Sequence, residues 1–258
     1  MIQGAAPVCT KILFADMAPL WMASLRFFVA ALSLLPFVYP LMRRQKLALR
    51  ALPWPQLMVI GILQTTGVMA FLNIGLTATT PSTAAILMAS NPLLVVILAR
   101  IFLGEKAAPL AIAGLVLAFV GVVVCIGVSE TRELDVGHGE TLVMLASACW
   151  AASTVFNKKF DIPMSPWIVT FWQMLIGAVA LAIVAGFYGQ PFALPATPFH
   201  WSIFIWLAVP ASTGAMGLWF AALKIGGSVQ TSGFLFLCPL FAALIAFFFS
   251  VKSLNGMK

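Results

Sequence analysis

The chain has 258 residues, of which 62% are hydrophobic and only 8% are charged, with a formal net charge of +7. Soluble domains carry about 25% charged residues, so this chain has too few charges to build a water-facing surface, and lipid must cover most of it. The basic residues lie in short gaps between apolar runs. That distribution suits membrane orientation and argues against nucleic-acid binding.

Continuous apolar runs predict a polytopic, all-α membrane protein. A helix needs about 20 apolar residues to cross the hydrocarbon core, and its backbone groups must be satisfied within the segment. A partial span, Ile2–Ala15, comes first. Eight full spans are expected after it: Met17–Met42, Trp54–Leu76, Thr80–Leu103, Pro109–Val128, Thr141–Asn157, Pro166–Tyr188, Phe199–Leu223 and Val229–Phe249.

Basic residues in short loops predict the orientation of these spans. With the partial span counted as the first helix, most basic residues fall in the loops that follow even-numbered helices. The richest of these loops holds Arg43, Arg44, Lys46 and Arg50. We therefore expect these loops and the N-terminus to be cytoplasmic. The predicted location is the plasma membrane, most simply a prokaryotic inner membrane, with multiple passes.

The two halves of the sequence share one register. Shifting the second half by 147 positions places Pro166 on Pro19, Pro239 on Pro92 and Gly214 on Gly67. Five helices per copy would make the second copy inverted, which is a common plan among transporters. We expect a first repeat at 1–128 with a shortened first helix and a linker at 129–140. The second repeat, at 141–258, is expected to lack its tenth helix, which makes about nine spans in all.

Several segments carry a resemblance to a known family: "ASLRFFVAAL" (Ala23–Leu32), "STAAILMASNPLLVVILARIFLGEK" (Ser82–Lys106), "GLVLAFVGVVV" (Gly114–Val124) and "LWFAALKIGGSVQTSGFLFLCPLFAALIAFFF" (Leu218–Phe249). They resemble the EamA-domain branch of the drug/metabolite transporter superfamily. The resemblance implies transport of a small metabolite by alternating access, with export of amino acids or related solutes as the expected activity. The alternative is a truncated, non-transporting remnant or a membrane assembly subunit.

Polar residues within membrane spans are costly and tend to mark transport pathways. Arg26 lies inside the second helix, where it faces either a substrate carboxylate or helix-end carbonyls, and Gln173 occupies the equivalent position of the second repeat. Asn73, Asn91 and Asn157 either contact solute or hydrogen-bond across helices. Pro92 is expected to kink its helix and free a carbonyl, and Pro239 is its counterpart.

Three tryptophans lie within spans rather than only at interfaces: Trp150, Trp172 and Trp219. Aromatic walls suit organic solutes with apolar parts, although core or lipid-facing packing would also explain these residues. A stripe of small residues, Gly114, Ala118, Gly121 and Cys125, lets another helix approach closely and could serve a homodimer. The expected partners are therefore the lipid bilayer, a small-molecule substrate and a second copy of the chain. We expect no enzymatic centre, metal or cofactor, since the two histidines are far apart in the sequence and no nucleophile–base pair is evident.

Overall fold

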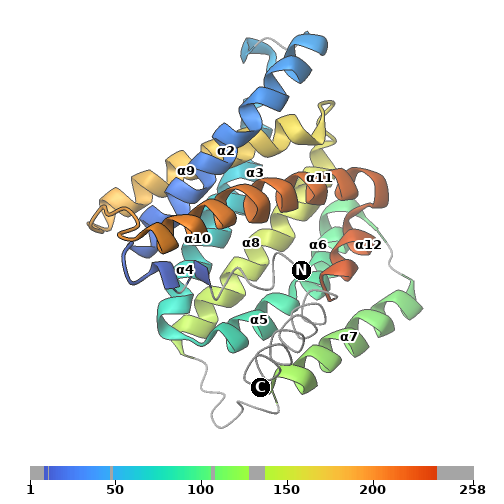
Figure 1. Ribbon diagram of the computed structural model, residues 1–258. Coiled ribbons are helices and arrows are strands. Elements are labelled where there is room, and N and C mark those ends of the chain that lie inside the picture. The colour runs from blue at the N-terminus through green and yellow to red at the C-terminus, as the bar shows by residue number, and fades with distance from the viewer. Residues whose placement is uncertain (1–8, 11, 47–48, 106–107, 128–136, 237–258) are drawn as a thin grey trace, which may run out of the picture.

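Proline opens most of the long helices, because its missing N–H is not needed in the first turn. The computed structural model describes residues 9–10, 12–46, 49–105, 108–127 and 137–236. All regular elements within these ranges are helical (Figure 1). They are α2 (Pro19–Arg44), η1 (Leu49–Ala51), α3 (Trp54–Gly61), η2 (Ile62–Gly67), α4 (Val68–Ala78), α5 (Pro81–Ala89), α6 (Asn91–Leu103), α7 (Pro109–Gly127), α8 (His138–Phe160), α9 (Pro166–Phe187), α10 (Pro198–Ala208), η3 (Val209–Gly214), α11 (Ala215–Gly226), α12 (Ser228–Gly233) and η4 (Phe234–Phe236).

Six of the described segments are long and apolar enough to cross a membrane, which confirms a polytopic α-helical membrane protein. They are Pro19–Arg44, Trp54–Ala78, Thr83–Leu103, His138–Phe160, Pro166–Phe187 and Pro198–Gly226. Most of the predicted spans Ile2–Ala15 and Val229–Phe249 lies outside the described residues, as do Pro239 and most of the linker at 129–140. The count of nine spans therefore remains a prediction.

Two predicted spans are not uniform α-helices. A π-helical segment, η2, separates α3 from α4, and a second one, η3, separates α10 from α11. In η3 the ring of Pro210 removes a backbone donor. The hydroxyl of Ser212 in this segment also donates to the Leu207 carbonyl, at 2.8 Å. Such segments are frequent at functional sites.

The predicted span Thr80–Leu103 is also interrupted. It divides at Ser90 into α5 and α6, and Pro92 lies in the first turn of α6. The expected kink thus takes the form of a one-residue interruption at Ser90, with Pro92 in the first turn that follows, where proline is accommodated most easily.

The loops gather at two ends of the bundle. One end, which we call the basic end, holds Arg43, Lys46, Lys158, Lys159 and Lys224. The opposite end holds Asp16, Glu140 and His200. Helix α2 begins at the opposite end, where the Leu20 N–H donates to Gln190 Oε1 at 3.1 Å. The helix is 26 residues long, or about 39 Å, and ends at Arg44. The loops at 43–50 and 189–198 therefore lie at opposite ends of α2.

Helices α2 and α9 pack side by side and run antiparallel along one side of the bundle (Figure 1). Their interface buries Phe27, Leu34, Met174 and Leu181. Helix α7 lies at the margin of the bundle, and many of its apolar side chains are exposed, as expected of a surface covered by lipid. No described atom comes within 4 Å of a Cβ built on Gly114 or Gly121, so these stripe positions are open.

Candidate functional site

The π-helical segment η2 carries a buried polar pair at the centre of the bundle. Thr65 Oγ1 donates to Gln173 Oε1 on α9 at 2.7 Å, and both residues are fully buried. The amide nitrogen of Gln173 has no described partner, and neither has the Oε1 of buried Gln64. Unpaired buried polar atoms are costly, so a donor and an acceptor left without a described partner here call for an explanation.

Two of the predicted tryptophans meet at the same level. The rings of Trp150 on α8 and Trp219 on α11 pack edge to face, with centroids 5.6 Å apart. Trp219 lies one turn from Met216, whose sulfur accepts from Gln64 Nε2 at 3.7 Å. Neither indole N–H has a described partner. We call Gln64, Gln173, Trp150 and Trp219 the central polar cluster. The sequence provided no spacing signal that would have joined Gln64 to the tryptophans.

Trp172 lies apart from this cluster. Its ring contacts Trp54 and Phe171 edge to face, with both centroid distances at 5.0 Å. The side chain therefore belongs to a different pocket, near the basic end. The three tryptophans do not form a single wall.

Arg26 is buried, at 7% exposure, and reaches across the bundle. Its Nε donates to Ser212 Oγ in η3 at 2.8 Å, and its guanidinium lies 5.2 Å from the centroid of the Phe27 ring. No carboxylate of the described chain forms an ion pair with it. The arginine therefore holds η3 against α2 while its charge has no described acidic counterpart.

The asparagines occupy different surroundings. Asn73 Nδ2 donates to the Pro19 carbonyl at 3.3 Å, and Asn91 Nδ2 donates to the Ser147 carbonyl at 3.0 Å. Both therefore link helices, although Asn91 Oδ1 is buried without a described partner. Asn157 instead lines a pocket of about 530 Å³ at the basic end. Phe220, which follows Trp219 in the sequence, is among the residues that line this pocket.

An ion pair closes one side of this basic-end pocket. Lys158 on α8 pairs with Glu105, which also accepts a hydrogen bond from Ser228 Oγ at 3.3 Å. Gly227, at φ 74°, brings its backbone against the lysine, because a Cβ here would lie 3.1 Å from Lys158 Nζ. The contact connects the segment that follows α6 with α8 and α12.

At the opposite end, a carboxylate joins the loop before α10 to the turn before α2. Asp16 Oδ2 accepts from the Ala196 N–H at 2.7 Å, and His200 Nδ1 lies 2.5 Å away. Trp21 Nε1 donates to the Gln190 carbonyl at 2.9 Å in the same loop. These contacts connect segments about 170–184 residues apart in the sequence, so no local pattern predicted them.

The Asp16 contact predicts a pH dependence. The Ala196 N–H, followed by the bond to His200, lowers the pKa of Asp16 below its ordinary 3.8. Because the folded-state pKa is lowered, the contact stabilises the loop above pH 3.8 and is lost as pH falls through the folded value. We expect Asp16→Asn to reduce amide-exchange protection of residues 190–197 at neutral pH, measured by mass spectrometry. Asp161→Asn at the basic end is the control, and unchanged protection in Asp16→Asn would contradict the assignment.

Comparison with known proteins connects this geometry to a family. The sequence pattern of the EamA-like transporter family matches residues 1–127 and again residues 137–258. A crystal structure at 19% sequence identity superposes with a TM-score of 0.78, covering 95% of this chain and 83% of that one. At this identity the likeness demonstrates the fold alone.

Curated relatives carry transporter names. The uncharacterized transporter YyaM of Bacillus subtilis is 33% identical over 193 residues, which cover 73% of this chain. The match spans only 63% of YyaM itself. An uncharacterized transporter of Archaeoglobus fulgidus is 27% identical over 96% of this chain and 85% of its own length. The chain therefore belongs to the EamA-like transporter family and is a multi-pass α-helical membrane protein.

Proposed function

We propose that the protein moves small organic solutes across the membrane by alternating access, with export of amino acids or related compounds as its activity. The observation that carries this proposal is the central polar cluster, where Gln64, Gln173, Trp150 and Trp219 leave donors and acceptors unpaired inside an apolar bundle. Indole N–H groups and amides recognise polar solute atoms, while the aromatic faces accept an apolar part.

The proposal includes two inverted five-helix repeats. The two π-helical segments support it, because Ile62–Gly67 and Val209–Gly214 are offset by the same 147 positions as the sequence repeat. Helices α2 and α9, which are equivalent in this register, run antiparallel. The family pattern also matches each half separately. An antiparallel relation between equivalent helices is what inverted repeats require.

Paired hydrogen bonds add further support. Arg26 of the first half bonds to Ser212 of the second, and Gln173 of the second half bonds to Thr65 of the first. The two residue pairs coincide under the shift of 147. A second pair also coincides: Thr213 Oγ1 donates to the Ala30 carbonyl at 3.1 Å, and Thr66 Oγ1 donates to the Gly177 carbonyl at 3.2 Å. Each π-helical segment is thus held to the second helix of the other repeat. Rocking of one repeat against the other would act on these bonds.

The two ends differ in a way that suits one state of an alternating cycle. The basic end has a pocket of about 530 Å³ whose lining includes Asn157 and Phe220. The opposite end is tied by the contacts of Asp16, Trp21 and Gln190. In the proposed orientation the basic end and the N-terminus are cytoplasmic, in a bacterial-type inner membrane. The described conformation then has its vestibule toward the cytoplasm.

A variant pair tests the site. Trp150→Phe and Trp219→Phe remove the unpaired indole donors but keep aromatic rings. We expect each to reduce solute flux about 10-fold, since losing one hydrogen bond to a bound solute costs about 1–1.5 kcal/mol. Flux is measured in proteoliposomes with a panel of radiolabelled amino acids. Trp201→Phe, at a 40% exposed residue, is the control.

Equal flux in all three variants would contradict the proposed site. A second outcome would favour the assembly-subunit alternative. In that outcome the chain inserts into the membrane and unfolds cooperatively but carries no solute, while a related transporter in the same preparation does.

A further inference from the structure

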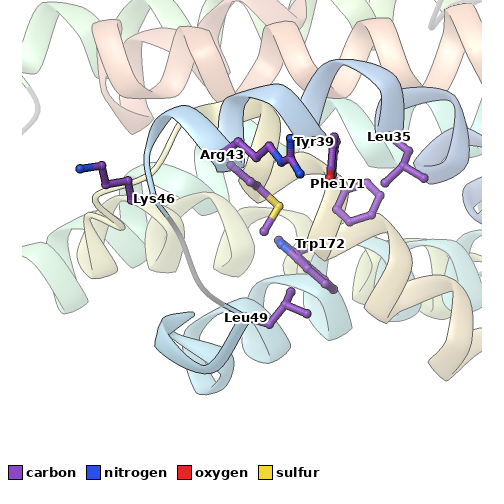
Figure 2. Close-up of a pocket in the computed structure, with 8 residues that line it drawn as sticks. Leu35, Tyr39, Arg43, Lys46, Leu49, Phe171 and Trp172 are labelled. Atoms are coloured by element: carbon purple, nitrogen blue, oxygen red, sulfur yellow. The ribbon is translucent and has the colours of Figure 1, made fainter.

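A second pocket opens at the side of the bundle, at the basic end of α2. Its volume is about 490 Å³, and its lining is mainly apolar. Leu35, Tyr39 and Arg43 line it from α2, and Phe171 and Trp172 line it from α9 (Figure 2). Leu35 and Tyr39 are 44% and 53% exposed, on a helix face that lipid covers. The pocket therefore opens toward the bilayer.

Two cations line the mouth of this pocket, and in Figure 2 the Lys46 side chain points away from Phe171 and Trp172. Arg43 and Lys46 both line it, and the Arg43 guanidinium lies 4.9 Å from the centroid of the Tyr39 ring. Within the described parts of the chain, no carboxylate forms an ion pair with either residue. The mouth is thus cationic and without a described counter-charge, while the interior is apolar.

A buried polar atom points to the same kind of ligand. The indole N–H of Trp172 is buried and has no described partner. In Figure 2 the nitrogen is at the end of the ring nearer Arg43. The polar groups therefore collect at the membrane-interface level of the pocket. Leu35 lies eight residues before Arg43 on α2, or about 12 Å deeper along the helix axis.

We propose that this side pocket binds an anionic phospholipid of the surrounding bilayer. The phosphate contacts Arg43 and lies in the positive field to which Lys46 adds. An ester carbonyl accepts from Trp172 Nε1, and an acyl chain lies along Leu35 and Phe171. Guanidinium and ammonium groups near a membrane surface attract anionic headgroups. The apolar interior adds specificity for a ligand with a chain. The site is separate from the central polar cluster and does not depend on the proposed transport.

The experiment compares two double variants that remove the same charge from the same end. Arg43→Gln with Lys46→Gln alters the pocket, whereas Arg44→Gln with Arg50→Gln alters two exposed cations outside its lining. Native mass spectrometry measures retention of phosphatidylglycerol by the full chain, taken from mixed micelles with phosphatidylcholine. We expect about 10-fold weaker retention in the first variant and less than a 2-fold change in the second.

Two further measurements complete the test. Phosphatidylglycerol with brominated acyl chains is expected to quench the tryptophan fluorescence of the parent chain more than that of the Trp172→Phe variant. This measurement does not depend on whether the charge variants fold. Glycerol phosphate, which lacks acyl chains, is expected not to displace the lipid. The proposal is overturned by equal losses in the two double variants, by equal quenching with and without Trp172, or by displacement with glycerol phosphate.

Discussion

Gly177→Ala is expected to lower the midpoint of thermal unfolding by about 3–10 °C, corresponding to about 1–3 kcal/mol of overpacking. A Cβ on Gly177 would lie 2.3 Å from the Cβ of Thr65 and 2.9 Å from the Gly61 carbonyl oxygen. Neither neighbour can move away easily. Thr65 is β-branched and hydrogen-bonded to Gln173, and the Gly61 oxygen belongs to the backbone. The glycine thus permits the close approach of α9 to η2 that forms the central cluster.

The matched control lies on the same helix. No described atom comes within 4 Å of a Cβ built on Gly186, so Gly186→Ala is expected to leave the midpoint unchanged or raise it slightly. Differential scanning fluorimetry of both variants in one detergent gives the comparison. If the unfolding midpoint of Gly177→Ala equals that of Gly186→Ala, α9 and η2 do not approach each other as closely as described.

Arg26→Gln is expected to reduce transport of carboxylate-bearing solutes about 100-fold and to leave their neutral analogues nearly unchanged. Loss of a charge-assisted bond in a buried site costs about 1.5–3 kcal/mol, and tenfold corresponds to about 1.4 kcal/mol. Glutamine retains a donor for Ser212 and copies Gln173, the residue that the second repeat uses at this position. The substitution therefore removes the charge while keeping the helix contact.

Ser212→Ala is the complementary variant, because it keeps the charge and removes the hydroxyl that accepts from Arg26 Nε. We expect it to lower thermal stability without changing the preference between charged and neutral solutes. Flux assays with an amino acid and its amide or ester analogue provide the measurement. Equal loss of both solutes in a stable Arg26→Gln protein would identify Arg26 as a structural residue.

The central site could be predicted only in part from the sequence. Arg26, Gln173, Trp150 and Trp219 stood out because polar and indole groups inside apolar runs are conspicuous. Their partners did not stand out, since Thr65 and Ser212 are ordinary small polar residues within helices. Trp172 could not be separated from the other tryptophans by position alone, because the rotation of α9 decides which neighbours its ring meets.

The sequence by itself determined that this chain is a multi-pass helical membrane protein, where most of its helices begin and end, and to which family it belongs. These properties depend on local features, namely apolar length, proline at helix starts and family motifs. The tertiary structure decided that η2 and η3 adopt π-helical geometry, which side chains pair across the bundle, and that a lipid-facing pocket forms at Arg43. The bond from Arg26 to Ser212 spans 186 residues, and such contacts depend on helix rotation, register and close packing that no local pattern encodes.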